Sequence, residues 1–210
     1  MQTKEINPTR SELQEIKKKI ELSQTGHSLL RKKRDALMME LFSAIERAKD
    51  AREELESEYD LARAKIAEAQ ATDGIAKIKS AAFARTDTPR IVVKTQNIMG
   101  IEVPHISETS VQRKIFERGY GIGGTSSRID EASTHYERVL EKVMIAAEVE
   151  TIIKKVLSEI ERTKRRVNAL EYKIMPDLQD TQKTIQMHLN ERERESLFVV
   201  KRIKKQMQNR

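Results

Sequence analysis

Apolar residues recur every seven positions through the last third of the chain. The first series, each member seven residues after the one before, comprises Val139, Ala146, Ile153, Ile160, Val167 and Ile174. A repeat of seven aligns its residues in one narrow stripe along an α-helix, and such a stripe is buried by a second helix rather than by a globular core. Charged residues fill most of the intervening positions. The pattern therefore predicts a C-terminal coiled-coil helix over residues 128–208.

This stripe shifts by one position at Pro176. Beyond the proline the apolar series continues through Leu178, Ile185, Leu189, Val199, Ile203 and Met207. Proline inside a helix removes a backbone hydrogen bond and clashes with the preceding turn. We therefore expect a bend or a local change of pairing within one turn of Ile174. Pro176 and the nearby Asn168 are our candidates for residues that set the helix register.

A second heptad series begins close to the N-terminus. Asn7 or Thr9 can cap a helix there, and Pro8 suits a first helical position. The series comprises Leu13, Ile16, Ile20, Ser23, His27, Leu30, Arg34, Leu37, Leu41, Ala44, Ala48, Ala51 and Leu55. It predicts an N-terminal coiled-coil helix over residues 8–72.

Three residues depart from the apolar character of this first helix. Gly26 costs about 1 kcal/mol relative to alanine in mid-helix; close approach of a partner helix and a tolerated surface glycine explain it equally well. His27 is interpreted as a structural residue of the seam, since no other ligand-type residues accompany it. Arg34 can fix the register, and we expect it to form an ion pair with Glu171, Asp177 or Asp180 on the facing helix.

The middle segment, residues 73–127, lacks the heptad repeat. Residues 75–84 can continue as a short helix after Gly74. Two β-prone runs, 91–94 and 101–103, flank a turn and predict a small hairpin. Because an isolated two-stranded hairpin is marginal in water, we expect it to pack against the helices or another subunit.

The glycines between Gly119 and Thr125 are not interpreted as a phosphate-binding loop. Neither the Lys-Ser/Thr pair nor the preceding hydrophobic strand that such a loop needs is present. The stretch is predicted to be a flexible connector, and Ser126 or Ser127 is expected to cap the helix that follows.

Two seams joined by a middle segment predict an all-α-dominated fold. We expect a long antiparallel two-helix coiled-coil hairpin, with a short β-hairpin and helical insertion at its loop end. Charge agrees with antiparallel pairing. Residues 10–34 contain 8 basic and 3 acidic groups and residues 191–210 contain 7 and 3, so pairing gathers both basic stretches at the end that holds the termini.

Composition narrows the class of protein further. With 35% charged and 4% aromatic residues and no Trp, the chain suits helices that bury a seam rather than a compact core. The lack of Cys excludes disulfides and thiolate metal sites and fits a reducing compartment. We find no signal peptide and no apolar run long enough to span a membrane. The net charge of +7 allows an anionic partner without identifying one.

The sequence offers no candidate for catalysis. It lacks a nucleophile elbow and a His-Glu-x-x-His motif, and its four His residues lie far apart. We therefore expect no catalytic residue, no cofactor-binding residue and no metal site. Two other interpretations stay open from the residues alone: a nucleic-acid-binding coiled coil, given the pI of about 9.5, and a cytosolic coiled-coil scaffold.

Several stretches together resemble the D subunit of the V-type and A-type ATPases, most closely the archaeal A-type form. They are Pro-Thr-Arg at 8–10, GHSLLRKKRDAL at 26–37, IVVKTQNIMGIEVP at 91–104, GIGGTSSRIDEA at 121–132, TKRRVNALEYKIMPDL at 163–178 and Asn-Glu-Arg-Glu-Arg-Glu at 190–195. The resemblance covers nearly the whole chain.

The resemblance implies a central rotor shaft that transmits torque between ATP hydrolysis or synthesis in a catalytic ring and ion movement in the membrane. It implies four kinds of partner: the catalytic and the regulatory subunits of the ring, the small central-stalk F subunit, and a funnel-shaped subunit on the membrane rotor ring. It implies no direct nucleotide, no nucleic acid, and membrane contact only through the complex, on the cytoplasmic side.

The C-terminal tip is the candidate bearing within the ring. We expect a polar and partly acidic socket, with Ile203 and Met207 turned toward the seam. The residues expected to face the ring are all basic: Arg192, Arg194, Lys201, Arg202, Lys204 and Lys205.

Overall fold

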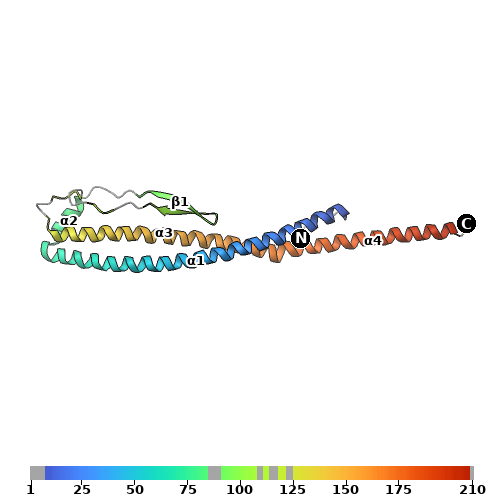
Figure 1. Cartoon of the computed structure of the whole chain (residues 1–210), viewed down its shortest axis with the longest axis horizontal. Coiled ribbons are helices and arrows are strands. Elements are labelled where there is room, and N and C mark those ends of the chain that lie inside the picture. The colour runs from blue at the N-terminus through green and yellow to red at the C-terminus, as the bar shows by residue number, and fades with distance from the viewer. Residues whose placement is uncertain (1–7, 85–90, 108–110, 114–117, 122–124, 209–210) are drawn as a thin grey trace. The chain divides into compact units, whose positions relative to one another are not determined.

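The computed structural model describes residues 8–84, 91–107, 111–113, 118–121 and 125–208. Helix dominates these residues, as the sequence predicts. The elements in chain order are α1 (Arg10–Asp73), α2 (Ile75–Phe83), β1 (Val93–Ile98), β2 (Ile101–Ile106), α3 (Ser127–Ala169), the π-helix η2 (Leu170–Ile174) and α4 (Met175–Gln208) (Figure 1). The chain divides into two compact units, one of Met1–Ala36 with Ile160–Arg210 and the other of Leu37–Glu159. They are called the terminal unit and the central unit below.

In the terminal unit the beginning of α1 pairs with α4. Leu13 and Ile16 pack against Ile185, with Ile20 and Leu189 at the edge of the cluster. Arg10 forms an ion pair with Glu193 at 2.6 Å, and farther along α1 His27 Nε2 lies 3.4 Å from Glu171. Because partner numbers fall as the numbers in α1 rise, the two segments are antiparallel, as predicted.

In the central unit, α1 also pairs with an antiparallel helix, α3, and the two run side by side in Figure 1. Four lateral contacts join them: Arg52–Glu150 at 3.0 Å, Glu54–Lys142 at 2.6 Å, Glu58–His135 at 2.8 Å and Lys65–Glu131 at 3.5 Å. The apolar seam of this pair includes Ala62, Val139 and Val149 among these contacts and continues past Arg52–Glu150 with Leu41, Ala44 and Val156, all of which are buried. Small residues such as Ala44, Ala51 and Ala62 allow close helix packing.

The predicted seams match the burial of the side chains. Every position of the N-terminal heptad series, from Leu13 to Leu55, is buried or half-buried. In the C-terminal series the five positions from Val139 to Val167 are likewise buried or half-buried, whereas Ile174 is 40% exposed. The exception has a local cause in the backbone.

That cause is the π-helical turn at Leu170–Ile174, directly before Pro176. The Met175 N–H donates to the carbonyl of Leu170, five residues back instead of four. A π turn accommodates one additional residue, so it rotates Ile174 out of the seam and moves the stripe by one position. The predicted irregularity within one turn of Ile174 is confirmed, and it coincides with the shift in the heptad.

The ends of α1 follow ordinary capping chemistry. Thr9 Oγ1 accepts a hydrogen bond from the Glu12 N–H at 3.2 Å, so Thr9 is the N-cap; Asn7, the other candidate, lies outside the described residues. Gly74 ends the helix with a φ of 77° and a ψ of 156°, a backbone conformation that only glycine adopts readily. The predicted short helix follows immediately as α2.

The hairpin of β1 and β2 packs on α3. The strands are antiparallel, and Ile98 pairs with Ile101 across a two-residue turn. Lys155 Nζ donates to the Glu102 carbonyl at 2.7 Å, and Glu148 accepts the Ile106 N–H at 3.0 Å. Val103 is completely buried. The expectation that the hairpin leans on a helix is therefore confirmed.

Two local expectations are wrong. Ser126 precedes α3, but its hydroxyl donates to Asp73 and joins the ends of α1 and α3 instead of capping α3. Arg34 forms its ion pair with the adjacent Asp35 at 2.8 Å, not with the facing helix. With His27 opposite Glu171 and Ile16 beside Ile185, the register brings residues near Arg166 opposite Arg34, and that segment is basic.

Candidate functional site: partner-binding surfaces

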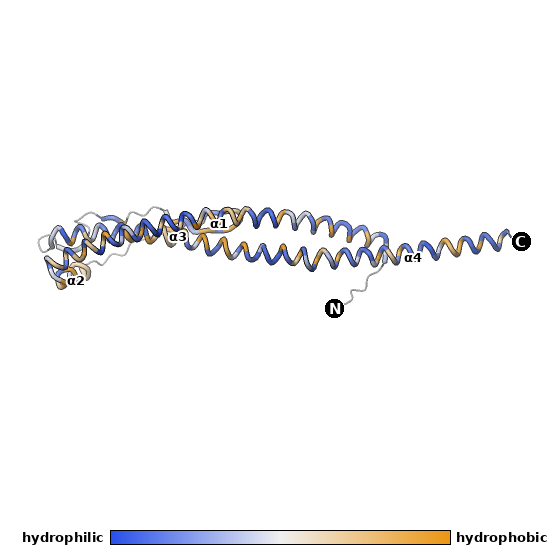
Figure 2. Tube along the Cα trace, turned by 90° about the horizontal axis from the view of Figure 1, so that it is seen from below, coloured by the Kyte–Doolittle hydropathy of each residue, from blue (hydrophilic) through white to orange (hydrophobic). Residues whose placement is uncertain are grey.

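The C-terminal part of α4 has no partner helix among the described residues of the terminal unit (Figures 1 and 2). At the very start of α1, Arg10 already pairs with Glu193, so α4 continues well beyond the point where α1 begins. From Asn190 to Gln208 nearly every residue is exposed. This segment, called the free tip below, is the part of the terminal unit that is most available to another protein.

The free tip carries both the predicted basic residues and an apolar stripe. All six predicted ring-facing residues, Arg192, Arg194, Lys201, Arg202, Lys204 and Lys205, are exposed, and Arg192 donates to the Pro8 carbonyl at 3.1 Å. Val199, Ile203 and Met207 are four residues apart and therefore share one face. They are 57%, 48% and 75% exposed, and Leu197 and Phe198 are also exposed.

The expectation that Ile203 and Met207 turn into a seam is therefore wrong. Their spacing does continue the seam of α4, but Arg10, the first residue of α1, already lies opposite Glu193, and no described residue of this unit covers the stripe beyond it. The free tip is thus an amphipathic helix that has an exposed apolar stripe on one face and mostly basic residues on its other faces.

Three of the residues that we proposed to set the helix register, Gly26, Asn168 and Pro176, lie in different environments. Gly26 is half-buried, and a Cβ built on it would meet no atom within 4 Å, so close packing inside this chain does not explain the glycine. Asn168 is exposed, one helical position before the end of α3. Pro176 is half-buried in the first turn of α4 and follows the π turn. No role for these three residues in binding follows from the geometry.

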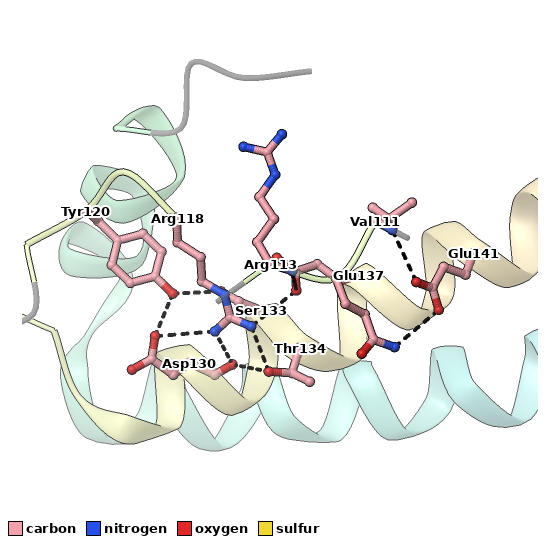
Figure 3. Close-up of polar contacts among 10 residues, drawn as sticks. Val111, Arg113, Arg118, Tyr120, Asp130, Ser133, Thr134, Glu137 and Glu141 are labelled. Atoms are coloured by element: carbon pink, nitrogen blue, oxygen red, sulfur yellow. Dashed lines mark hydrogen bonds and ion pairs between the residues drawn. The ribbon is translucent and has the colours of Figure 1, made fainter. Parts of the chain in front are cut away.

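The central unit contains a buried ionic cluster that the heptad pattern does not predict (Figure 3). Arg118 is 5% exposed and Glu137 is fully buried. Arg118 Nη2 lies 3.1 Å from Glu137 Oε2, and Arg118 Nη1 donates to the Asp130 carbonyl at 3.0 Å. Tyr120 donates to Asp130 at 2.6 Å. Arg118 and Tyr120 thus hold the segment 118–121 on the beginning of α3.

Glu137 and its neighbours on α3 also bind the backbone that leads into this segment. Glu137 accepts the Arg113 N–H at 3.3 Å, and Glu141 accepts the Val111 N–H at 3.2 Å. Three carboxylates along α3, those of Glu137, Glu141 and Glu148, therefore accept backbone N–H groups of the middle segment. They attach the strand β2 and the following loop to this helix. The predicted flexible connector is therefore anchored on its N-terminal side. A heptad search finds only apolar positions and could not reveal these carboxylates.

The cluster changes the proton affinity of two of its members. Burial raises the pKa of the Tyr120 hydroxyl, and the hydrogen bond to the Asp130 carboxylate raises it further. Burial alone would lower the pKa of Arg118, but the Tyr120 hydroxyl and the Glu137 carboxylate outweigh burial and raise it. Arg118 is therefore a permanent cation in this cluster.

Two further features of the central unit could receive a partner. A groove of about 340 Å³ lies between α1 and α3, lined by Ile45, Ala48 and Ile153 and flanked by charged residues. A cavity of about 220 Å³ lies where α1, α2 and α3 meet, beside Arg118 and Tyr120. Neither contains the constellation of groups that catalysis requires.

Metal-binding and membrane-spanning features are missing from the described parts of the chain. The described residues contain no group of three or more His, Cys, Asp or Glu side chains arranged to hold a metal ion. None of the helices, over the part of the chain that the structure describes, is both long and apolar enough to cross a bilayer. What the geometry offers is a set of protein-binding surfaces on paired helices.

Antiparallel helix pairs with an apolar seam and lateral ion pairs define a coiled-coil protein. Comparison with known proteins specifies the family. The family model for the D subunit of ATP synthase matches residues 12–205. The chain belongs to this family.

Individual relatives agree over nearly their full lengths. The A-type ATP synthase D subunit of Methanococcoides burtonii is 53% identical over 205 residues, which cover 98% of this chain and all of the relative. The subunits of the same name from Methanosarcina acetivorans and Haloarcula marismortui are each 48% identical; the matches cover 100% and 96% of this chain and 100% and 87% of the relatives. These matches do not favour the scaffold or the nucleic-acid-binding interpretation.

Proposed function

We propose that this chain is the central rotor shaft of an A-type ATP synthase and transmits torque between the catalytic ring and the ion-translocating membrane sector. The observation that carries the proposal is the family match over residues 12–205, together with relatives that match along nearly their whole length. In this role the chain is a subunit of the complex and has no catalytic residue, nucleotide site or cofactor of its own.

The helix pairs support this proposal physically. Torque transmission requires a stiff element whose two helices do not slide past each other. Within each unit the seam is buried, and lateral ion pairs such as Arg10–Glu193 and Arg52–Glu150 cross it. Exposed pairs of this kind contribute at most about 1 kcal/mol each, so the seam supplies most of the stiffness and the ion pairs mainly favour one register.

The free tip is our candidate for the bearing within the catalytic ring. Its six basic residues would meet acidic groups of the ring, while Val199, Ile203 and Met207 would lie against apolar ones. Because exposed charges act weakly one at a time, single alanine substitutions of Arg192, Arg194 or Lys201 should leave hydrolysis nearly unchanged. Each residue of the apolar stripe should contribute more to binding within the ring than each charge does, since its burial removes apolar surface from water.

The groove between α1 and α3 is our candidate for the small central-stalk F subunit. Ile45, Ala48 and Ile153 give it an apolar floor, and Phe42, 59% exposed, lies three residues before Ile45 on the same side of α1. Lys49 and Lys154 flank the floor. A helix with an apolar face and acidic edges fits this surface. The Phe42→Ser variant should bind the purified F subunit more weakly, and Tyr59→Ser, another exposed aromatic of α1, should not.

The remaining contacts follow from the same role. We propose that the funnel-shaped subunit links the chain to the membrane rotor ring, and that the complex holds the chain at the cytoplasmic side of the membrane as a peripheral component. No residue of this chain needs to enter the bilayer.

Truncation after Ser196 tests the bearing. The variant lacks most of the free tip but keeps the cluster of Leu13, Ile16 and Ile185. In a complex reconstituted in vesicles, hydrolysis and ion pumping are measured together. We expect weaker assembly, or hydrolysis that no longer drives pumping. A variant in which only Lys204 becomes alanine is the matched control, because a single exposed charge contributes little, and it should behave like the wild type. Full pumping by the truncated chain would show that another part of the protein is the bearing.

A further inference from the structure

The two outer edges of the β-hairpin differ in how their backbone groups are paired. On the edge of β2, Lys155 Nζ donates to the Glu102 carbonyl at 2.7 Å, and Glu148 accepts the Ile106 N–H at 3.0 Å. Between these two positions lies Pro104, which has no N–H group to pair. Side chains of a neighbouring helix and a proline both protect an edge strand from further pairing. The edge of β2 is therefore closed.

The outer edge of β1 has no such protection. The Ser107 N–H donates to the Val92 carbonyl at 3.1 Å. Because hydrogen-bonded and non-hydrogen-bonded pairs alternate along an antiparallel ladder, the even-numbered residues of β1 bond to β2. The odd-numbered residues direct their N–H and C=O groups to the opposite side: Val93, Thr95 and Asn97. All three are exposed, and their backbone groups have no hydrogen-bond partner among the described residues.

The unpaired groups on β1 specify an extended backbone as their partner. They recur every two residues, which is about 7 Å along a strand. A second strand presents complementary donors and acceptors at the same spacing, and such strand addition is a common mode of peptide recognition. A helix uses its backbone groups internally, and a small molecule does not reach all three residues. The edge therefore fits an extended segment of polypeptide.

The side chains of β1 define the chemistry of this segment. Val93 is 57% exposed and shares one face of the strand with Thr95. Such β-branched residues pair well with β-branched or aromatic residues on a neighbouring strand. On the other face Lys94 is exposed and forms no ion pair among the described residues, and its neighbour across the hairpin is His105. A carboxylate of the incoming segment beside Lys94 would supply the missing charge.

This requirement for a carboxylate argues against a second copy of the chain. If two copies paired through β1, each would bring a strand without any acidic residue, so neither Lys94 would gain a partner. Each chain also has a net charge of +7, which opposes self-association. The segment is therefore expected to come from a different protein.

We propose that β1 is extended by a strand of another subunit, which pairs with Val93, Thr95 and Asn97 and places a carboxylate beside Lys94. The proposal rests on the proposed function, which supplies the neighbouring subunits. Since Glu148 and Lys155 attach the hairpin to α3, a strand bonded to β1 has to turn together with this chain. The partner is thus a rotating subunit of the central stalk and not a subunit of the catalytic ring.

Proline at position 95 tests the pairing. Thr95→Pro removes an N–H that points away from β2, so the hairpin keeps its own hydrogen bonds while an incoming strand loses a donor. Thr95→Ala retains the N–H and is the matched control. The full-length variants are titrated with the purified F subunit and with the purified funnel-shaped subunit by calorimetry, and their thermal unfolding is recorded. If Thr95→Pro lowers the Tm, Val93→Pro on the same edge takes its place.

We expect Thr95→Pro to bind one of these two subunits at least about tenfold more weakly, because a carbonyl of the incoming strand loses its donor, while Thr95→Ala binds like the wild type. Hydrogen exchange of the wild-type chain gives a second readout. Binding of that subunit should slow exchange at the amides of Val93, Thr95 and Asn97, whereas the amides of Lys94 and Gln96, which bond to β2, should change little.

Three results would contradict the proposal. Unchanged binding of both subunits by Thr95→Pro, or an equal loss in Thr95→Ala, would show that the backbone of this edge does not bind them, and would leave the proposed function standing. A dimer of the isolated chain that Thr95→Pro dissociates would identify the occupant as a second copy. A wild-type chain that binds neither subunit would overturn the proposed function itself, and the added strand with it.

Discussion

At the scale of single residues, charge burial distinguishes the central unit from an ordinary coiled coil. Arg118 and Glu137 are almost completely removed from water, and together they connect the middle segment to α3. A buried ion pair is not in itself strongly stabilising, because desolvation offsets much of the attraction. Removing only one partner, however, leaves an uncompensated charge in the interior.

Glu137→Ala should therefore destabilise the protein by about 3–5 kcal/mol. The loss follows from the stranded Arg118 charge and from the freed Arg113 N–H. In the double variant Arg118→Met with Glu137→Leu, both charges are gone and apolar volume replaces them, so much of the loss should be recovered. Urea denaturation of the two variants measures the difference. If both variants were destabilised equally, the uncompensated charge of Arg118 would not be the cause of the lost stability.

Tyr120 gives the cluster a pH dependence at alkaline pH. Because burial and the hydrogen bond to Asp130 raise the pKa of its hydroxyl, the folded chain retains this proton to a higher pH than the unfolded chain. The contribution is complete below the unfolded pKa of about 10 and is lost as the pH rises through the folded value. The urea midpoint should therefore fall more steeply above about pH 10 in the wild type than in Tyr120→Phe. Parallel curves for the two proteins would contradict this assignment.

Sequence reasoning captured the apolar residues well and the polar ones poorly, for a physical reason. Heptad spacing identifies which side chains face a partner helix, and Leu13, Leu37 and Val167 are buried as that spacing predicts. It carries no information about polar side chains that pair across distant segments. Thr163 was missed for a different reason: it occupies a seam position, seven residues after Val156, and is 1% exposed, but a search for apolar residues passes over a threonine.

At the scale of elements, the π turn reconciles two heptad series that are out of phase by one residue. Sequence alone located the irregularity at Pro176 but did not specify its form. The structure shows that the irregularity is a π turn, which keeps the backbone helical and absorbs the additional residue. The register of Arg34 was mispredicted because heptads indicate which face is buried but not how far one helix slides along the other.

Deletion of one residue should convert this turn to regular α-helix. Tyr172 is 75% exposed within the π turn. Removing it, together with Pro176→Ala, takes out the additional residue while both seams keep their alignment, so the Tm should be unchanged or raised. Deleting the exposed Arg165 instead, with the same proline substitution, should rotate Val167, which is 3% exposed, out of the seam before the π turn can absorb the missing residue, and so lower the Tm.

The backbone at positions 169–174 can be checked in a crystal structure of the Tyr172 deletion. We expect hydrogen bonds between residues four apart throughout. Retention of a π turn despite the missing residue would mean that the tertiary packing, rather than the residue count, determines it.

At the scale of the whole molecule, the sequence supported both the class of protein and its family, since heptads mark both long helical regions and the family motifs extend over nearly the entire chain. What it could not supply is the identity of the surfaces that other subunits contact. The apolar stripe of the free tip illustrates the difficulty: the spacing of Val199, Ile203 and Met207 is that of a seam, and only the structure shows that none of the described residues covers them.

The central claim is that this chain turns inside the ring, and rotation of a single molecule tests it most directly. The chain has no cysteine, so a cysteine at the exposed position of Ser57 provides a unique attachment point for a probe. With the catalytic ring fixed to a surface, we expect the probe to rotate in one direction, only while ATP is hydrolysed, and to stop when hydrolysis is inhibited. A probe that stays still while the ring hydrolyses ATP at its full rate would contradict the role of a rotor shaft.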